Sequence, residues 1–333
     1  MDGEWSPWCD PPAGLVAPVR ARPRDKHGPS VREAYGPRWR RTGPGLFVPA
    51  ATDEAVVEQR ILEQAARLGP YGALTGWAAL RWRGAAYFDG TARGDRQVLP
   101  VPLAVGRACL RPDPAVEVIR RQLPSDEWAV VRGVRCAIAA RALFDEVIRL
   151  GSARPAAVAI DMAVAGELLA VAEFWTFLKH IGPRNGVVLA REAASLACGT
   201  HWSPQEAWMC QSWCLDAGLP KARYNVPVFD RHGNLLGIPD LFDADAGVVG
   251  EYQGAVHRDA AQHRRDVERA EGFRAHRLEY FEVVAGEMSD GVLVAKRMRD
   301  ARDRALFLPP DARTWTLDQP SWWLTRHQER RAS

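Results

Sequence analysis

Residues 238–254 have the sequence IPDLFDADAGVVGEYQG, with acidic side chains on both sides of a short polar turn. Runs of apolar residues before and after the turn predict a β-hairpin. If Asp243 faces Val248 across the turn, counting outward places Asp240 opposite Glu251. Directly opposed residues of a hairpin lie about 5 Å apart at Cβ, so we expect these two carboxylates at one position.

The residue two places beyond Glu251 belongs to the same expected site. Side chains alternate along a strand, so Gln253 shares the face of Glu251. Two hard oxygen ligands on adjacent strands suit Mg²⁺ (or Mn²⁺), with water and phosphate oxygens filling the other positions. Such an ion activates water and offsets charge on a phosphodiester. The hairpin therefore predicts a metal site formed by Asp240 and Glu251.

The surrounding segment, residues 199–308, has the pattern of an α/β unit. A Ser-Pro-x-Glu start and a glycine end predict a helix over residues 203–217. Apolar and polar patterning predicts the order helix, three strands, helix, strand, helix for the whole segment. The later elements are expected at residues 224–229, 235–242, 248–253, 259–276, 278–284 and 290–306.

Ile238-Pro239-Asp240, followed after ten residues by Glu251-Tyr252-Gln253-Gly254, resembles the PD-(D/E)xK nuclease superfamily and most closely its Vsr-like branch. The resemblance covers about residues 199–285. It implies a restriction-endonuclease-like domain that hydrolyses DNA phosphodiester bonds with Mg²⁺ or Mn²⁺ held by Asp240 and Glu251. The superfamily lysine corresponds to Gln253, whose amide can position water but cannot take its proton.

Two more residues of the resemblance are candidates for the catalytic group. His257 follows the third strand closely and is either a general base or phosphate ligand or else an ordinary surface residue. Glu206 lies on the first helix, where the superfamily often has an acid. The Ser203-x-x-Glu206 spacing is also a capping box, so a catalytic and a structural role both stay open for Glu206.

The front of the chain has a basic hairpin pattern. A short helix over residues 31–35 precedes Arg38, Trp39, Arg40 and Arg41, a Gly/Pro turn and an apolar strand, as in the wing of a winged helix. This part is similar to the winged-helix region of AbiE-type antitoxins. We expect these four residues to contact DNA, the arginines through phosphates. Arg264 and Arg265 of the helix after the acidic hairpin form either a further DNA contact or a solvated surface of ion pairs with nearby acids.

The fold class expected for the whole chain is a multidomain α+β and α/β protein. A strand pattern over residues 98–138 is followed by an alanine-rich helical pattern, and neither carries evident chemistry. The predicted divisions are a flexible leader (1–28), a winged-helix-like region (29–95), a mixed strand and helical scaffold (96–198), a nuclease-like domain (199–308) and a tail (309–333).

Composition limits the compartment and the partners. The 333 residues carry a net charge of +3, too little for a protein that coats nucleic acid, although a local basic patch is compatible with it. The sequence has neither a long apolar run nor a signal peptide pattern, which indicates a cytoplasmic protein with reduced thiols and no membrane partner. Cys198, His201, Cys210 and Cys214 fit no common zinc spacing, so buried thiols are expected.

Three functions remain open from the sequence, of which the third is a protein-interaction scaffold formed by the helical middle. The first is a Mg²⁺-dependent endonuclease acting on double-stranded DNA. The second is a non-catalytic DNA-binding regulator of the AbiE-type antitoxin kind, with a degenerate nuclease fold and a toxin or defence-system partner. Retention of Asp240 and Glu251 favours the first function, and Gln253 favours the second. The sequence does not indicate the oligomeric state.

Overall fold

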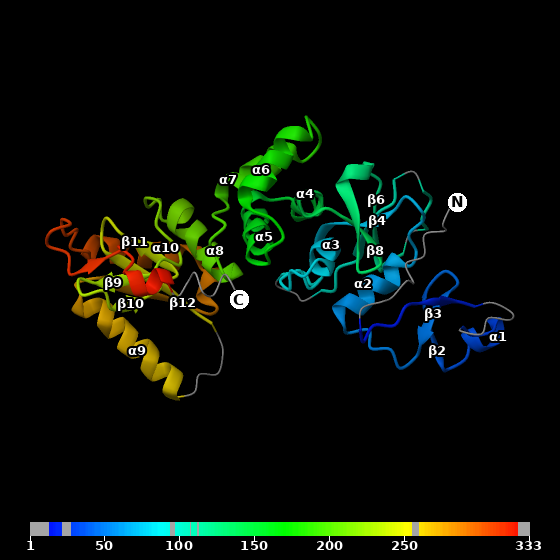
Figure 1. The fold of residues 1–333 in the computed structure, drawn as a ribbon, viewed down its shortest axis with the longest axis horizontal. Helices are drawn as coiled ribbons and strands as arrows, with labels where there is room; N and C mark the ends of the chain where they lie inside the picture. The colour runs from blue at the N-terminus through cyan, green and yellow to red at the C-terminus, as the bar shows by residue number, and fades with distance from the viewer. Residues whose placement is uncertain are drawn as a thin grey trace. The chain divides into compact units, whose positions relative to one another are not determined.

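The computed structural model describes residues 13–21, 28–93, 97–106, 108–111, 113–254 and 260–325, but not the side chains of residues 260–263. Helices and several small sheets alternate along the chain, and this confirms the predicted mixed α/β class (Figure 1). The chain divides into two compact units, Met1–Gly199 and Thr200–Ser333. Within the described residues, no helix is both long and apolar enough to cross a membrane.

The predicted basic hairpin is present at the start of the first unit. Strand β2 (Trp39–Gly43) pairs antiparallel with β3 (Leu46–Pro49), and β1 (Val19–Arg20) pairs with the other edge of β3. The short helix α1 (Val31–Ala34) begins at Ser30, whose side chain accepts a hydrogen bond from the backbone of the third helical residue. The hairpin therefore has a small helix beside it in the sequence, as expected.

The rest of the first unit combines a five-stranded sheet with six helices, and their apolar side chains form one continuous core. Small alanine side chains let the later helices approach one another closely (green in Figure 1). The sheet has the order β6-β5-β4-β8-β7. Its strands are β4 (Ala73–Leu74), β5 (Val101–Ala104), β6 (Val116–Ile119), β7 (Trp128–Val131) and β8 (Val134–Ala137). The helices are α2 (Val57–Ala65), α3 (Gly76–Trp82), α4 (Ala139–Leu150), α5 (Ala153–Ala165), α6 (Val171–His180) and α7 (Val187–Leu196).

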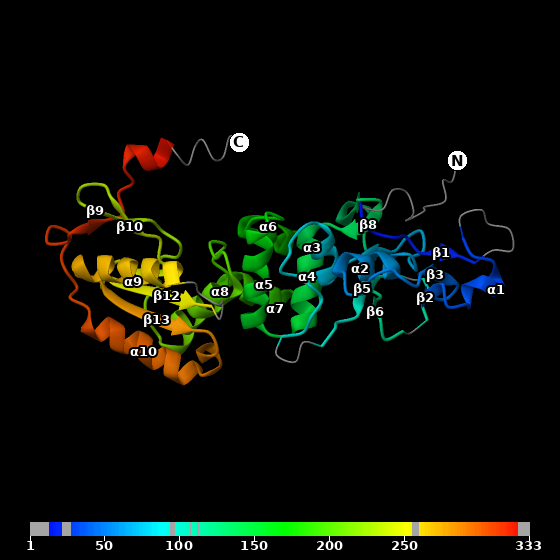
Figure 2. The same ribbon diagram turned by 90° about the horizontal axis from the view of Figure 1, so that it is seen from below.

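The second unit is built on a three-stranded sheet in the order β11-β12-β13. Strands β11 (Leu241–Asp243) and β12 (Val248–Gln253) are antiparallel, whereas β12 and β13 (Glu279–Val284) are parallel. Helix α9 (Ala260–Ala275) is the crossover that two parallel strands require. Helix α10 (Gly291–Arg304) lies on the opposite side of the sheet from α9 (Figure 2).

One predicted strand of the second unit is wrong in its extent. Residues 235–242 form two strands, β10 (Leu235–Gly237) and β11, separated by a break at Pro239. Proline has no backbone N–H and cannot continue a ladder, so the chain changes sheets there. Strand β10 joins a second small sheet with β9 (Val228–Asp230) and β14 (Trp315–Thr316).

The face of the main sheet beneath α9 carries both a core and a polar end. Phe242, Val249 and Tyr280 pack with Phe273 of α9 in one hydrophobic cluster. Alternation along β12 places Glu251 and Gln253 on the same face as Val249, beyond this cluster. The core therefore fixes the position of α9 over the sheet, and the acidic residues lie at the edge of the packed region.

Candidate functional site

The hairpin register that the sequence predicts is confirmed. Asp243 pairs with Val248, and Leu241 pairs with Gly250, at the start of β11. Asp240 lies just outside the strand, and its Oδ2 accepts a 2.8 Å hydrogen bond from the backbone N–H of Tyr252. The carboxylate of Asp240 is thereby held against the strand that carries Glu251.

Glu251 is buried and Asp240 is half-buried, and the two carboxyl groups interact electrostatically. Burial is the largest cause that raises the pKa of Glu251 to about 8, and the negative charge of Asp240 raises it further. Burial also raises the pKa of Asp240 to about 6, against the effect of the hydrogen bond from Tyr252. Two such groups ionise together at neutral pH only when positive charge is nearby, as in a cation site.

Helix α9 brings a positive charge to this pair. Nη2 of Arg269 donates to Oε2 of Glu251 at 2.8 Å and lies 3.5 Å from Oδ1 of Asp266. This ion pair lowers the pKa of Glu251 and opposes the effect of burial. Arg269 is not among the site residues that the sequence predicts. A spacing of three residues from Asp266 is compatible with an ion pair within the helix, but no sequence pattern predicts the contact with β12.

Strand β13 supplies another acid that sequence reasoning missed. Glu282 pairs with Glu251 across the parallel strands, and parallel partners share a face of the sheet. Oε1 of Glu282 accepts hydrogen bonds from Nε2 of Gln253 at 2.9 Å and from the hydroxyl of Tyr280 at 2.8 Å. These residues line a cavity of about 350 Å³ beneath α9, together with Asp266.

Two oxygen atoms on this face have no hydrogen-bond partner among the described residues. They are Oε1 of Glu251 and Oε1 of Gln253, and both residues are buried. Buried acceptors are nearly always satisfied in native proteins, so a pair left without donors on one strand needs an explanation. Carboxylate and amide oxygens are the ligands that Mg²⁺ and Mn²⁺ prefer, and the residues present therefore fit such an ion.

Glu206 has the helix-capping role that its spacing predicted, except that its side chain binds the backbone of Trp202 in place of that of Ser203. Oγ of Ser203 accepts a hydrogen bond from the backbone of Glu206 at the start of α8 (Pro204–Gln211). The side chain of Glu206 accepts from the backbone of Trp202 at 2.9 Å and from Asn225 at 2.7 Å. Its charge also raises the pKa of Asp240, so Glu206 lies within electrostatic reach of the acidic pair.

The other sequence candidates fall in different places. His257 lies outside the described residues. Arg264 and Arg265 are exposed near the start of α9. In the hairpin of the first unit, Arg38 and Arg41 are exposed and Trp39 is half-buried.

Arg40 differs from its neighbours in the hairpin. Its guanidinium donates two hydrogen bonds, of 3.0 and 2.7 Å, to the carboxylate of Glu63 on α2. The side chain of Glu63 is only 5% exposed, so the pair joins the hairpin to the core of the unit. Expected as a DNA contact, Arg40 is therefore engaged within the protein.

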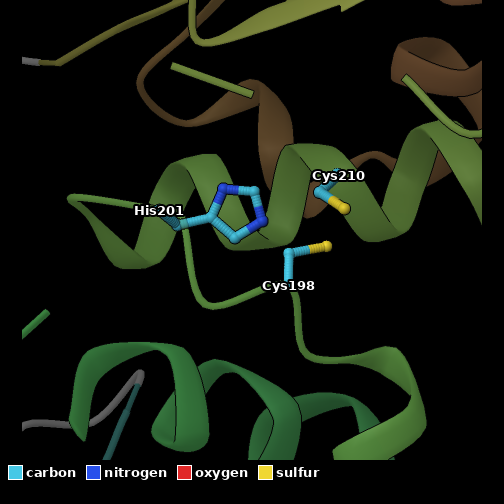
Figure 3. Close-up of side chains that lie close together, drawn as sticks. All are labelled: Cys198, His201 and Cys210. Carbon is cyan, nitrogen blue, oxygen red and sulfur yellow. The ribbon is translucent and has the colours of Figure 1, made fainter. Parts of the chain in front are cut away.

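A second group of ligating side chains contains Cys198, His201 and Cys210. One ligand atom of each residue lies within 4.8 Å of the other two, and Figure 3 shows the imidazole and the two thiols close together. The spacing of these residues did not predict that they would meet. Thiols and imidazole suit Zn²⁺ and not Mg²⁺, so this group adds nothing to the case for the acidic site.

Comparison with known proteins yields no relative for this chain: no family model, no curated protein and no solved structure matches it.

Proposed function

We propose that the second unit is a nuclease domain that hydrolyses phosphodiester bonds of double-stranded DNA with a Mg²⁺ or Mn²⁺ ion bound by Asp240 and Glu251. The observation that carries this proposal is the electrostatically coupled carboxyl pair Asp240 and Glu251, with buried oxygens of Glu251 and Gln253 that have no donor among the described residues. In this proposal the domain is restriction-endonuclease-like, and the three strands and two covering helices are its core.

The residues around the pair have separate tasks in this proposal. A bound divalent cation would lower the pKa of the attacking water and offset the charge that develops on the phosphate. Tyr252 holds Asp240 through its backbone N–H, and Arg269 holds one oxygen of Glu251, so both carboxylates are fixed before an ion arrives. Gln253 has no group that accepts a proton, and we assign this task to His257 on the sequence argument alone.

The basic hairpin is the proposed DNA contact of the first unit, in a winged-helix-like region. Arg38 and Arg41 are exposed and suited to phosphate oxygens, and Trp39 lies between them in the sequence. Arg40 keeps the hairpin in place through Glu63. Arg264 and Arg265 extend from the start of α9 in the unit that contains the acidic pair.

The test is nicking of supercoiled plasmid by the full chain with Mg²⁺ or Mn²⁺. Wild type should convert plasmid to the open-circular form, and Asp240→Ala and Glu251→Ala should not. Glu268→Ala is the matched control, because Glu268 is an exposed acid of α9 and should cut as wild type does. Cutting that survives in Asp240→Ala, or that needs no divalent cation, would overturn the proposal.

A second function is favoured by one observation. Gln253 stands where a lysine would orient the water, and its amide is engaged with Glu282. A chain that has lost catalysis but keeps exposed hairpin arginines would act as a DNA-binding regulator of antitoxin type with a toxin partner. Wild type that binds duplex DNA through Arg38 and Arg41 and nicks nothing with either ion would support this function.

A further inference from the structure

The side-chain amide of Gln253 has one chemically defined orientation. Gln253 is 7% exposed, and its Nε2 lies 2.9 Å from Oε1 of Glu282 on the adjacent parallel strand. Oε1 of Glu282 acts as an acceptor here, so its partner is the NH₂ end of the amide and not the oxygen. The side-chain oxygen of Gln253 therefore lies on the side of the amide away from this contact.

Glu282 is itself held in place. The hydroxyl of Tyr280 donates to the same Oε1 at 2.8 Å. The backbone oxygen of Glu282 accepts a 2.7 Å hydrogen bond from Arg297 of α10, so the strand is fixed from the opposite face as well. Because two donors meet on one carboxylate oxygen, rotation of Glu282 would break both hydrogen bonds. The amide of Gln253 consequently cannot turn over without cost.

The oxygen that this arrangement presents is unsatisfied. Oε1 of Gln253 and Oε1 of Glu251 are both buried, and neither has a hydrogen-bond donor within the described part of the chain. The two residues are two positions apart on β12, so their side chains project from the same face of the sheet. Each carries a second atom that is well bonded, to Glu282 and to Arg269 respectively. The bonded atoms fix the side chains, and the two remaining oxygens are left for a common partner.

A hard divalent cation is the partner with the right chemistry. Mg²⁺ and related ions accept neutral amide oxygens together with carboxylates. A lysine at this position could not serve as a ligand, because its ammonium group has no lone pair. Glutamine in place of lysine therefore not only removes a positive charge but also adds an oxygen atom that can bind a metal ion.

We propose that Gln253 is a direct ligand of the divalent cation through its side-chain oxygen, and that Glu282 is the positioning residue that orients it. This proposal rests on the cation site of the proposed function and deepens it. It also separates the roles on β12: Glu251 and Gln253 hold the ion, so the proton of the attacking water passes to a residue outside this strand.

The experiment measures Mn²⁺ binding by the full chain without DNA, from the electron paramagnetic resonance signal of free Mn²⁺. Gln253→Met keeps the side-chain length and removes the hard oxygen, and it should raise the Kd for Mn²⁺ at least roughly 10-fold. Gln253→Lys is a second variant without the oxygen and should act in the same direction. Gln205→Met is the control, because it makes the same exchange at a half-buried position on α8 and should leave the Kd unchanged.

Two substitutions of Glu282 separate positioning from a general effect on the fold. Glu282→Leu removes the acceptor and should raise the Kd roughly 10-fold, in the range for partners that orient a ligand. Glu282→Gln still offers an oxygen to Gln253 and to Tyr280, so it should restore binding to within about 3-fold of wild type. Melting temperatures in EDTA identify any variant that has lost its fold, and Glu282→Ala then replaces Glu282→Leu.

Each outcome has one meaning. Mn²⁺ affinity that is unchanged in Asp240→Ala would overturn the cation site itself, and with it the proposed function. Affinity that is lost in Asp240→Ala but unchanged in both Gln253 variants would overturn the ligand role of Gln253 and leave the site standing. Equal loss in Glu282→Leu and Glu282→Gln would overturn the positioning role, because the acceptor oxygen would then not be the feature that matters.

Discussion

The backbone N–H of Tyr252 donates a 2.8 Å hydrogen bond to Oδ2 of Asp240, which ties a residue outside β11 to the neighbouring strand near its C-terminal end. The ladder between β11 and β12 begins at Leu241. The hydrogen bond from Tyr252 links the two segments just beyond that point. As a result, the carboxylate of Asp240 is held near Glu251 even though the two residues are not paired within the ladder.

The raised pKa values of Asp240 and Glu251 predict that the protein without a cation becomes less stable as the pH rises. The folded state raises the pKa of Asp240 to about 6 and that of Glu251 to about 8. The folded protein therefore holds protons that the unfolded chain has released, and the free energy of unfolding falls from about pH 4 to above pH 8. Melting temperatures in EDTA across this range should decrease.

A variant that lacks the carboxyl group of Glu251 tests whether the raised pKa of this group causes the decrease in stability. Glu251→Gln should remove the decrease between about pH 6 and 8 and make it shallower below pH 6, whereas Glu271→Gln, at an exposed position of α9, should behave as wild type. Saturating Mn²⁺ should remove most of the decrease in wild type, because the ion favours the ionised carboxylates. A melting temperature that rises through this range in EDTA would contradict the prediction.

The hairpin arginines should separate into stabilising and DNA-binding residues. Arg40→Ala leaves the buried carboxylate of Glu63 with a hydrogen bond from Gln59 but without its ion pair, and should cost about 1–3 kcal/mol of unfolding free energy. Arg41 is exposed and donates to the nearby backbone of Gly43, so Arg41→Ala should leave the melting temperature nearly unchanged. Urea unfolding of the two variants gives the comparison.

DNA binding by the same variants tests the other half of this division. Arg41→Ala and Arg38→Ala should each weaken duplex DNA binding about equally for all sequences and should reduce the slope of affinity against salt. If Arg40→Ala lowers DNA affinity while its stability is that of wild type, the assignment of Arg40 to the fold is wrong.

The sequence predicted those parts of the site that depend on neighbours along the chain. The turn before Val248 and the alternation of side chains along both strands were enough to place Asp240 near Glu251. The break at Pro239 was missed, because an apolar run on both sides resembles one continuous strand. Only the missing N–H of proline indicated that the ladder would end there.

The partners of the acidic pair depend on packing between distant segments, and the sequence did not predict them. Glu282 reaches Glu251 because β12 and β13 are parallel and in register, a pairing that α9 permits but does not specify. Arg269 reaches Glu251 because Phe273, one turn later, packs into the core beneath α9 and sets the rotation of the helix. Neither relationship has a local sequence pattern.

Close packing at Gly250 supports the sheet that carries the site. A Cβ atom at this position would lie 2.4 Å from Cζ of Phe281, whose ring is stacked on Trp213 and cannot move aside freely. Gly250→Ala should therefore cost about 1–3 kcal/mol of unfolding free energy. Gly272→Ala is the control, since a Cβ there has no atom within 4 Å and alanine favours the helix, so stability should rise by about 0.5–1 kcal/mol. Equal effects of the two substitutions in urea unfolding would contradict this account.

The ion pair between Arg269 and Glu251 should be measurable as a change in one pKa. Arg269 lowers the pKa of Glu251 through its charge, so Arg269→Gln should raise that pKa above its value of about 8. Titration of ¹³C-labelled glutamate carboxyl groups by NMR, without a cation, follows the residue directly, and Glu251→Gln identifies its signal. Arg264→Gln is the matched control, because Arg264 is exposed on the same helix and should leave the pKa unchanged. A pKa of Glu251 that stays the same or falls in Arg269→Gln would show that the guanidinium does not act on this carboxylate in solution.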